Sequence, residues 1–145
     1  MAEKFDLEAF VPFRLNRAAE LVSLGFAAQY QKTYGMTRPE WRALAALGNF
    51  GRMTATEIGR HSKMHKTKVS RAVQSMEERR WLRREDDPDD RRVEHLELTP
   101  LGLKFYREIV VLARAYETEI LKRLGKSGLL SLEAGLDAIE AAYRD

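Results

Sequence analysis

The sequence contains no cysteine among its 145 residues. That absence excludes disulfide bonds, thiolate nucleophiles, iron–sulfur ligation and oxidant sensing through a thiol. Long apolar runs are also missing, since no stretch approaches the roughly eighteen apolar residues that cross a membrane as a helix. The first ten residues, MAEKFDLEAF, carry acidic side chains where a secretory signal carries a basic flank and a long apolar segment. We therefore expect a cytoplasmic protein without a membrane anchor.

Motifs of the common enzyme classes are absent as well. There is no glycine-rich phosphate loop and no G-x-S-x-G nucleophile motif. His61, His65 and His95 are the only histidines, and no glutamate lies between the first two as it would in an H-E-x-x-H zinc site. We expect neither an enzyme nor a bound metal or organic cofactor.

The sequence does contain one strongly basic segment. Residues 60–84 hold nine basic and two acidic side chains, a net charge of +7, whereas the whole chain has +3 and the other residues therefore sum to −4. This uneven distribution is typical of a protein that binds a polyanion. A solvated helix face would carry the same charges, and charge alone does not separate the two interpretations. With 44% hydrophobic and 32% charged residues, the chain otherwise suits one soluble domain with a helical extension.

Two helices are predicted before the basic segment. Apolar residues recur at helical spacing from Leu7 to about Tyr34, and Gly35 predicts the end of this helix. Pro12 either kinks the segment or lies in its first turn. The stretch TRPE (37–40) is a capping box that starts a second helix, which is expected to end near Gly48.

A second capping box, TATE (54–57), predicts a short helix to about His61. After a tight turn, a further helix is expected from about His65 to Arg79. Its apolar residues follow i, i+3, i+4, i+7 spacing and are Val69, Ala72, Val73 and Met76. Its opposite side carries Thr67, Ser70, Arg71, Gln74 and Glu78. Such a helix buries one stripe and presents a polar, basic face to a partner.

The pattern then changes from helical spacing to alternation. Residues 81–84 and 93–99 predict two short strands, which the stretch DDPDDRR (86–92) connects as a hairpin. Pro100 and Gly102 mark the start of a long helix to about Leu124, Gly125 to Gly128 break it, and residues 129–143 form a last amphipathic helix. The predicted fold class is mainly α with a small β wing (α+β), in the order of a winged helix-turn-helix.

Three segments resemble the MarR family of bacterial transcriptional regulators. They are TRPEWRALAAL (37–47), TATEIGRHSKMHKTKVSRAVQSMEERRWLRR (54–84) and DPDDRRVEHLELTPLG (87–102). The most specific match is Asp90-x-Arg92 followed by LELTPLG. One position departs from the family pattern, because Arg80 stands where the family usually has a glycine that ends the recognition helix with a positive φ. A non-glycine residue adopts that conformation at a cost of roughly 1 kcal/mol, so the departure concerns the path into the wing rather than the fold.

The resemblance implies a homodimer that binds double-stranded DNA. It places an N-terminal dimerisation helix in residues 1–34, a winged helix-turn-helix DNA-binding lobe in residues 37–99 and C-terminal dimerisation helices in residues 100–145. The long apolar stripes of the terminal helices independently favour burial between two chains. Two recognition helices spaced by one turn of duplex predict a near-palindromic operator. Repression is the expected outcome, because a compact dimer occludes polymerase.

The polar face of the helix from His65 contains the candidate DNA contacts. Arg71 and Gln74 are expected at base edges, because their paired groups match guanine and adenine respectively. Lysines of the same region neutralise phosphate, which gives affinity but little sequence information. The expected DNA-binding set is Lys63, His65, Lys66, Thr67, Lys68, Ser70, Arg71, Gln74, Asp90, Arg91 and Arg92. The alternatives are a merely solvated helix and a winged helix that binds another protein, which the basic segment disfavours.

The acidic stretch DDPDDRR fits a wing tip better than a calcium loop. A calcium loop needs regularly spaced oxygens and usually a glycine at its sixth position, but counting from Asp86 the third residue is Pro88 and the sixth is Arg91. The resemblance implies instead that Asp90 holds Arg92 and that Arg92 enters the minor groove, where the negative potential is enhanced. The remaining acids keep the turn solvated.

The resemblance also implies a small anionic or phenolic effector, bound between the dimer helices and the winged lobe. Such a molecule acts only through unequal affinity for the DNA-competent and DNA-incompetent states. The candidate effector-binding residues are Arg14, Arg17 and Trp41, near Phe10, Phe13 and Tyr30. The alternative is that Arg14 and Arg17 make ion pairs and the aromatic residues belong to the core.

Overall fold

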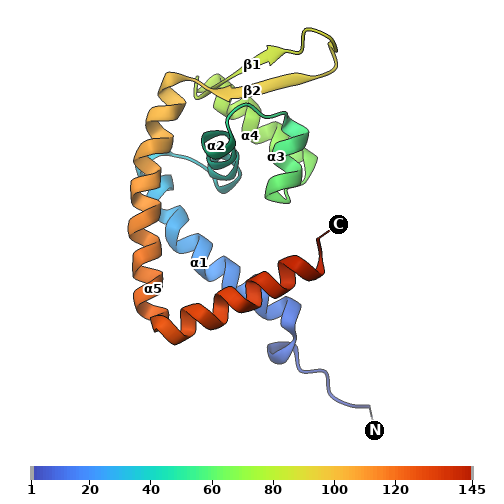
Figure 1. The fold of residues 1–145 in the computed structure, drawn as a ribbon, viewed down its shortest axis with the longest axis vertical. Helices are drawn as coiled ribbons and strands as arrows, with labels where there is room; N and C mark the ends of the chain where they lie inside the picture. Colours follow the sequence, from blue (N-terminus) through green and yellow to red (C-terminus); the bar gives the residue numbers. More distant parts are fainter. Residues whose placement is uncertain (1, 145) are drawn as a thin grey trace. The chain divides into compact units, whose positions relative to one another are not determined.

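The computed structural model describes residues 2–144 and has the predicted order of helices and strands, with the last two helices joined across a kink (Figure 1). The elements are η1 (Leu7–Ala9), α1 (Val11–Tyr34), α2 (Arg38–Phe50), α3 (Ala55–Ser62), α4 (Lys66–Glu78), β1 (Leu82–Asp86), β2 (Glu94–Leu98) and α5 (Pro100–Ala142). The predicted fold class, mainly helical with a small two-stranded wing, is confirmed. The chain divides into two compact units between Ile109 and Val110. Within residues 2–144, no helix is both long and apolar enough to span a membrane.

The first helix begins later than predicted. Leu7–Ala9 form a 3-10 turn that the Asp6 side chain caps, and α1 starts at Val11 with Pro12 in its first turn. The N–H groups of a first turn have no acceptor within the helix, so a proline is tolerated there. The helix ends at Gly35, which has a φ of 62°, as predicted.

Helix α2 starts at the predicted capping box and ends later than predicted. The Glu40 N–H donates to Thr37 Oγ1 and the Thr37 N–H donates to Glu40 Oε1, both at 3.2 Å. The predicted end near Gly48 is wrong, because the helix continues to Phe50 and ends at Gly51. Gly48 has a packing role instead, since a Cβ on it would lie 2.4 Å from the ring of Tyr106. The missing side chain lets this ring of α5 lie directly on the α2 backbone.

The core of the first unit lies between α2, α3, α4 and the base of the hairpin, which Figure 1 shows grouped together. The stripe predicted for α4 is buried, and each of its members is at most 4% exposed: Val69, Ala72, Val73 and Met76. Leu44 of α2 and Ile58 of α3 are fully buried in the same core. Burying each large apolar side chain stabilises the fold by about 1.5–3 kcal/mol, which fixes the rotation of α4 about its axis.

The hairpin is held to the lobe at its base. Strands β1 and β2 pair antiparallel from Leu82 opposite Leu98 to Asp86 opposite Glu94. Met53, just before α3, adds a bridge to β2, with its N–H and C=O bonded to the backbone of Leu96 at 3.0 and 2.7 Å. This extra bridge ties the hairpin to the segment that starts the helix-turn-helix.

The corner between α4 and β1 has the conformation that the family's usual glycine would take. Arg80 has a φ of 63°. Its N–H donates to the C=O of Glu77 at 2.9 Å, and the Trp81 N–H donates to the C=O of Met76 at 2.8 Å, which together form a Schellman motif. Arg80 thus accepts a left-handed conformation that costs roughly 1 kcal/mol, and the helix still ends in the usual way.

The first turns of α5 belong to the same unit as the lobe, so this unit extends beyond residue 99. Gly102 and Ile109 are buried there, and the hydroxyl of Tyr34 at the end of α1 donates to Glu108 Oε2 at 2.7 Å. Burial, together with this bond to a carboxylate, raises the pKa of Tyr34 to about 12, so the hydroxyl stays protonated. The break predicted at Gly125 to Gly128 is narrower than expected, because Gly125 alone is non-helical, with φ 70° and ψ 172°.

Candidate nucleic-acid interface

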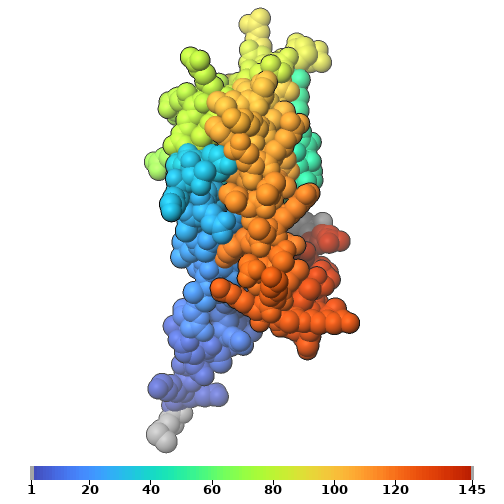
Figure 2. Space-filling view, turned by 90° about the vertical axis from the view of Figure 1, so that its left-hand side faces the viewer, coloured from blue at the N-terminus to red at the C-terminus, as the bar shows by residue number. Residues whose placement is uncertain are grey.

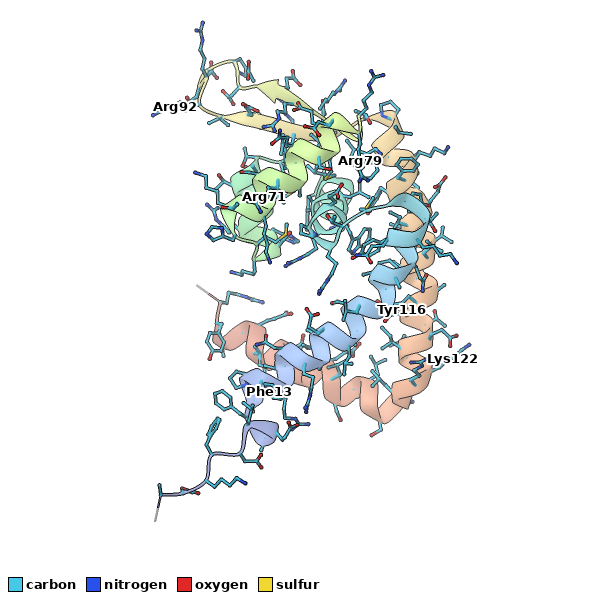
Figure 3. The ribbon with its side chains drawn as sticks, turned by 180° about the vertical axis from the view of Figure 1, so that it is seen from behind. Phe13, Arg71, Arg79, Arg92, Tyr116 and Lys122 are labelled. Atoms are coloured by element: carbon cyan, nitrogen blue, oxygen red, sulfur yellow. The ribbon has the colours of Figure 1, made fainter. Side chains whose placement is uncertain are left out.

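Helix α4 presents the predicted polar face to solvent. The residues predicted for this face are all exposed: Thr67, Ser70, Arg71, Gln74 and Glu78. Figure 3 shows Arg71 on this helix, in the same unit as the hairpin whose end carries Arg92. Because the opposite stripe is buried, the polar face cannot turn inward without losing the core contacts.

The turn before α4 is fixed by the backbone. Lys63 has a positive φ of 53°, and the Met64 N–H donates to the C=O of Gly59 at 2.9 Å. His65 is the N-cap, and its Nδ1 accepts the Thr67 N–H at 3.2 Å. The sequence did not reveal the strained conformation of Lys63, because no glycine or asparagine marks it. These bonds place the exposed Lys63 and His65 beside the first turn of α4.

The basic segment separates into free and paired cations. On the helix-turn-helix and the corner that follows it, the exposed bases that make no ion pair with any residue in 2–144 are Arg60, Lys63, Lys66, Lys68, Arg71 and Arg80. In contrast, Arg83 of β1 binds Glu97 at 2.6 Å, and Arg84 of the same strand binds both Glu77 and Glu94 at 3.1 Å. The positive charge available to a polyanion is therefore concentrated on the helix-turn-helix rather than on the strands.

Arg79 joins α4 to the end of α1. Its Nη1 and Nη2 both donate to the C=O of Gly35 at 3.1 Å, and its Nη1 lies 3.9 Å from Oε2 of Glu40. The guanidinium also lies over the ring of Trp81, 4.6 Å from its centroid. Glu40 is only 2% exposed and contacts Ser75 Oγ at 3.4 Å, so it links α2 to α4 as well. Arg79 therefore supports the position of α4, and its charge is not free for a ligand.

Replacing Arg79 by methionine is expected to lower the free energy of unfolding by about 1–3 kcal/mol, because the carbonyls at the end of α1 lose donors and buried Glu40 loses a counter-charge. Urea unfolding measures this change. The matched variant Lys66→Met removes an exposed, unpaired cation and should stay within about 0.5 kcal/mol of the unsubstituted protein. Equal stabilities for the two variants would contradict the supporting role of Arg79.

The wing tip has the Asp90–Arg92 pair that the resemblance implied. Asp90 Oδ1 accepts the Arg92 N–H at 3.0 Å and the Arg92 Nε–H at 3.2 Å. The Arg92 side chain is nevertheless 91% exposed, and Figure 3 shows it at the end of the hairpin. In Figure 2 the hairpin, in yellow, stands out from the surface of the lobe. Arg91 beside it is also exposed. The tip therefore presents guanidinium groups on a short, internally braced loop.

Asp87 and His95 brace this loop from inside. Asp87 Oδ1 accepts the N–H groups of Asp89 at 2.9 Å and Asp90 at 3.1 Å, while its Oδ2 lies 2.8 Å from His95 Nε2. The contact with His95, reinforced by the two backbone bonds, lowers the pKa of Asp87. The sequence analysis predicted only that these acids keep the turn solvated. It did not predict the contact with His95, which lies opposite Glu85 in the hairpin and reaches Asp87 through its side chain.

A pH-dependent contribution of Asp87 follows from its lowered pKa. Its ionised form is favoured by the fold, so the stabilisation is fully present above the unfolded-state pKa of about 4 and is lost as the pH falls through the lower folded-state value. Asp87→Asn should destabilise the hairpin at neutral pH and have progressively less effect below about pH 4. Hydrogen exchange of the hairpin amides at several pH values measures this. An effect independent of pH in acid would contradict the assignment.

A cavity of about 740 Å³ lies between α1, α2 and α4. Phe26, Tyr30 and Trp41 form its aromatic wall, with ring centroids 5.2–5.7 Å apart. Its charged lining consists of Glu20, Arg38, Arg42 and Lys68. Three cations against one carboxylate make it suitable for an anion with an aromatic ring.

Of the three candidate effector residues, the structure places only Trp41 in this cavity. Arg14 and Arg17 line a separate hollow on α1 with Leu21. Arg17 is paired with Glu8 and lies over the Phe13 ring, 5.0 Å from its centroid. Sequence reasoning missed Arg38 and Arg42, because they become neighbours of the aromatic wall only when α1 and α2 pack together.

The histidines have structural partners rather than a shared ligand. His61 stacks edge-on against Phe50, with centroids 4.6 Å apart, while His65 and His95 make the bonds described above. Among residues 2–144, no three histidine or acidic side chains converge in a way that could hold a metal ion.

Comparison with known proteins agrees with this geometry. Residues 34–93 match a sequence model of the MarR family. The helix-turn-helix-type transcriptional regulator YwoH of Bacillus subtilis is 29% identical over 108 residues, which are 74% of this chain and 77% of that protein. The structure of the MarR family transcriptional regulator SPO1453 of Silicibacter pomeroyi superposes with a TM-score of 0.79 at 27% identity, covering 94% of this chain and 99% of the other.

A third relative shares the fold at lower identity. BpsR of Bordetella bronchiseptica, whose DNA binding is regulated by 6-hydroxynicotinic acid, superposes with a TM-score of 0.82 at 20% identity and covers 99% of this chain and 100% of its own. The order of elements, the wing motif and these relatives agree. By this family match over residues 34–93 and by these relatives, the chain is similar to the MarR family of winged helix-turn-helix, DNA-binding transcriptional regulators.

Proposed function

We propose that this regulator is a homodimeric repressor, which binds a near-palindromic operator and releases it when a small aromatic anion binds. The observation that carries the proposal is the exposed face of α4, with its unpaired cations and with a stripe buried on the opposite side. Repression follows from occlusion, because two such lobes on adjacent turns of duplex cover the sites that polymerase needs.

The proposed contacts with DNA are of two kinds: contacts to base edges, which recognise the sequence, and contacts to phosphates, which position the protein on the duplex. Arg71 and Gln74, at the centre of the exposed face of α4, read base edges in the major groove. Thr67 and Ser70 contact bases or phosphates, and His65, Lys63, Lys66 and Lys68 contact phosphates. Arg92, held by Asp90 and flanked by Arg91, enters the minor groove beside the recognition helix.

Exposed apolar side chains support the homodimer. In the first unit they follow η1 and α1: Leu7, Phe10, Val11, Leu15, Leu21, Val22 and Leu24 are 41–71% exposed. In the second unit Leu130, Leu132, Leu136 and Ile139 are 37–58% exposed. Apolar patches of this extent on a helical protein are usually buried against another chain, and a second copy supplies matching ones.

The cavity between α1, α2 and α4 is the proposed effector site. Its aromatic wall stacks on a ring, and its cations bind a carboxylate. Burial raises the pKa of Tyr30 against the opposing effect of Arg38 and Arg42, so its hydroxyl remains a donor at neutral pH. The regulation of BpsR by an aromatic acid is consistent with such a ligand. The proposed set keeps Trp41 and replaces Arg14 and Arg17 by Arg38, Arg42 and Lys68.

The test begins with the DNA fragments that the purified protein retains from its own genome. A repressor dimer should protect a discrete two-fold symmetric site and lose affinity steeply with salt, by a factor of ten or more between low and physiological salt. Light scattering should give the mass of two chains. Weak binding that depends only on fragment length would instead indicate a winged helix that binds another protein, and would contradict the proposal.

A further inference from the structure

Lys68 lies on two surfaces at once. It is in the first turn of α4, exposed and without an ion pair to any described residue, and it also lines the cavity between α1, α2 and α4. It is the one residue of the recognition helix in that lining. No other residue of the proposed phosphate-binding set shares this position.

Helical geometry explains why Lys68 differs from its neighbour Lys66. At about 100° per residue, the two lysines are separated by roughly 200° and lie on opposite flanks of the DNA-facing side of α4. Lys66 lies over the hollow between α3 and α4 with Ser70 and Arg60. Lys68 lies on the flank of α4 that carries Ser75, whose hydroxyl contacts Glu40 of α2 at 3.4 Å. The DNA-facing side therefore has one lysine on each edge, and one of them borders the cavity.

The other cations of the cavity already have partners. Arg38 Nη1 binds the carboxylate of Glu20 at 3.0 and 3.1 Å, and Arg42 donates to the C=O of Ser62. An anion that enters the cavity meets Lys68 as the cation that no described residue engages. Its flexible chain allows the ammonium to point toward the cavity or toward the DNA-facing side.

We propose that the Lys68 ammonium binds either an operator phosphate or the carboxylate of a small aromatic anion in the cavity, so that the two ligands compete for one cation. This inference rests on the proposed function and assigns its regulation to one side chain. When the carboxylate is bound, its single negative charge neutralises Lys68, and the ammonium is no longer available to an operator phosphate. This loss of one cation weakens DNA binding without a change in the spacing of the two lobes. By linkage, DNA weakens anion binding by the same factor.

The test compares Lys68→Met with Lys66→Met in the full-length protein. The probe is benzoate, the smallest aromatic carboxylate, with benzamide as the uncharged control and chloride to match ionic strength. Operator affinity is measured by fluorescence anisotropy across a range of salt and benzoate concentrations. Both variants should lose a similar amount of operator affinity. The slope of log K against log salt concentration should become shallower by about one per protomer, because each variant removes one phosphate contact.

The two variants should differ in their response to benzoate. In the unsubstituted protein and in Lys66→Met, saturating benzoate should lower operator affinity at least about five-fold beyond matched chloride. In Lys68→Met this difference should fall to within about two-fold, and Lys68→Arg should restore most of it because the charge is kept.

Each contrary result has a distinct meaning. An undiminished benzoate effect in Lys68→Met, with the unsubstituted protein responding, would overturn the role of Lys68 and leave the proposed effector site standing. If the salt dependence of operator affinity is unchanged in Lys68→Met, Lys68 does not contact a phosphate, and the proposed competition is overturned. If benzoate has no effect beyond ionic strength on the unsubstituted protein, both the competition and the proposed anion site fail. Failure to bind a discrete operator would refute the proposed function itself.

Discussion

Gly102→Ala is expected to lower the free energy of unfolding by about 3 kcal/mol or more, a large effect for the addition of a single methyl group. Gly102 is buried in the first turn of α5. A Cβ at this position would lie 2.0 Å from the carbonyl oxygen of Trp81 and 3.4 Å from Cβ of Leu98. Contacts of 2.0 Å do not occur between such atoms, so part of the backbone must move.

The clash is costly because the Trp81 carbonyl is already engaged. It accepts the Thr99 N–H at 3.0 Å, and Thr99 Oγ1 donates to the carbonyl of Arg80 at 2.6 Å and accepts the Gly102 N–H at 3.1 Å. This network joins the end of α4, the end of β2 and the start of α5. Moving Trp81 would disturb the Schellman corner and the wing together. Loss of operator affinity should therefore accompany the loss of stability.

Urea and thermal unfolding test this prediction, with Gly135→Ala as the matched control. A Cβ on Gly135 would meet no atom within 4 Å. Because alanine favours a helix over glycine, this control should be more stable than the unsubstituted protein by about 0.5–1 kcal/mol. Similar stabilities for the two alanine variants would show that the corner relaxes easily and that the wing is not tied to α5 in this way.

Arg71→Ala is expected to weaken operator binding by about 1–3 kcal/mol and to relax the preference at one base pair in each half-site. Arg71 is exposed at the centre of the polar face of α4 and makes no ion pair within residues 2–144, so removing it should leave the stability nearly unchanged. The guanidinium is free to donate two hydrogen bonds to one guanine, and alanine can donate none.

The measurement is binding to the operator and to its single-base variants at fixed salt. For Arg71→Ala, one base position should lose its discrimination while the others keep theirs. Lys66→Met serves as the comparison, because a phosphate contact should weaken all sequences alike and flatten the salt dependence. If Arg71→Ala weakens every duplex equally, Arg71 contacts the backbone of the DNA and another side chain reads the base.

Several features of the fold depend only on residues that are close together along the chain. The capping box at Thr37, the buried stripe of α4 and the left-handed Gly35 depend on residues close to one another along the chain, and all were predictable. The same holds for the polar face of α4, since a helix with one buried stripe exposes the opposite side. The Asp90–Arg92 pair was predictable from the resemblance, because the two residues are separated by a single position in a tight turn.

Residue patterns along the chain were therefore enough to predict the order of the elements, the buried side of α4 and the resemblance to the MarR family. Tertiary structure alone decided which cations are free, because Arg79 is engaged by Gly35 and Arg83 by Glu97, both distant in sequence. Tertiary structure also explains two glycines, because a Cβ on Gly48 would clash with the ring of Tyr106 and a Cβ on Gly102 would clash with the carbonyl of Trp81. The physical reason is the range of the interactions. Caps and periodicity act along the chain, whereas counter-charges, close backbone approaches and the cavity beside Lys68 exist only after distant segments pack together.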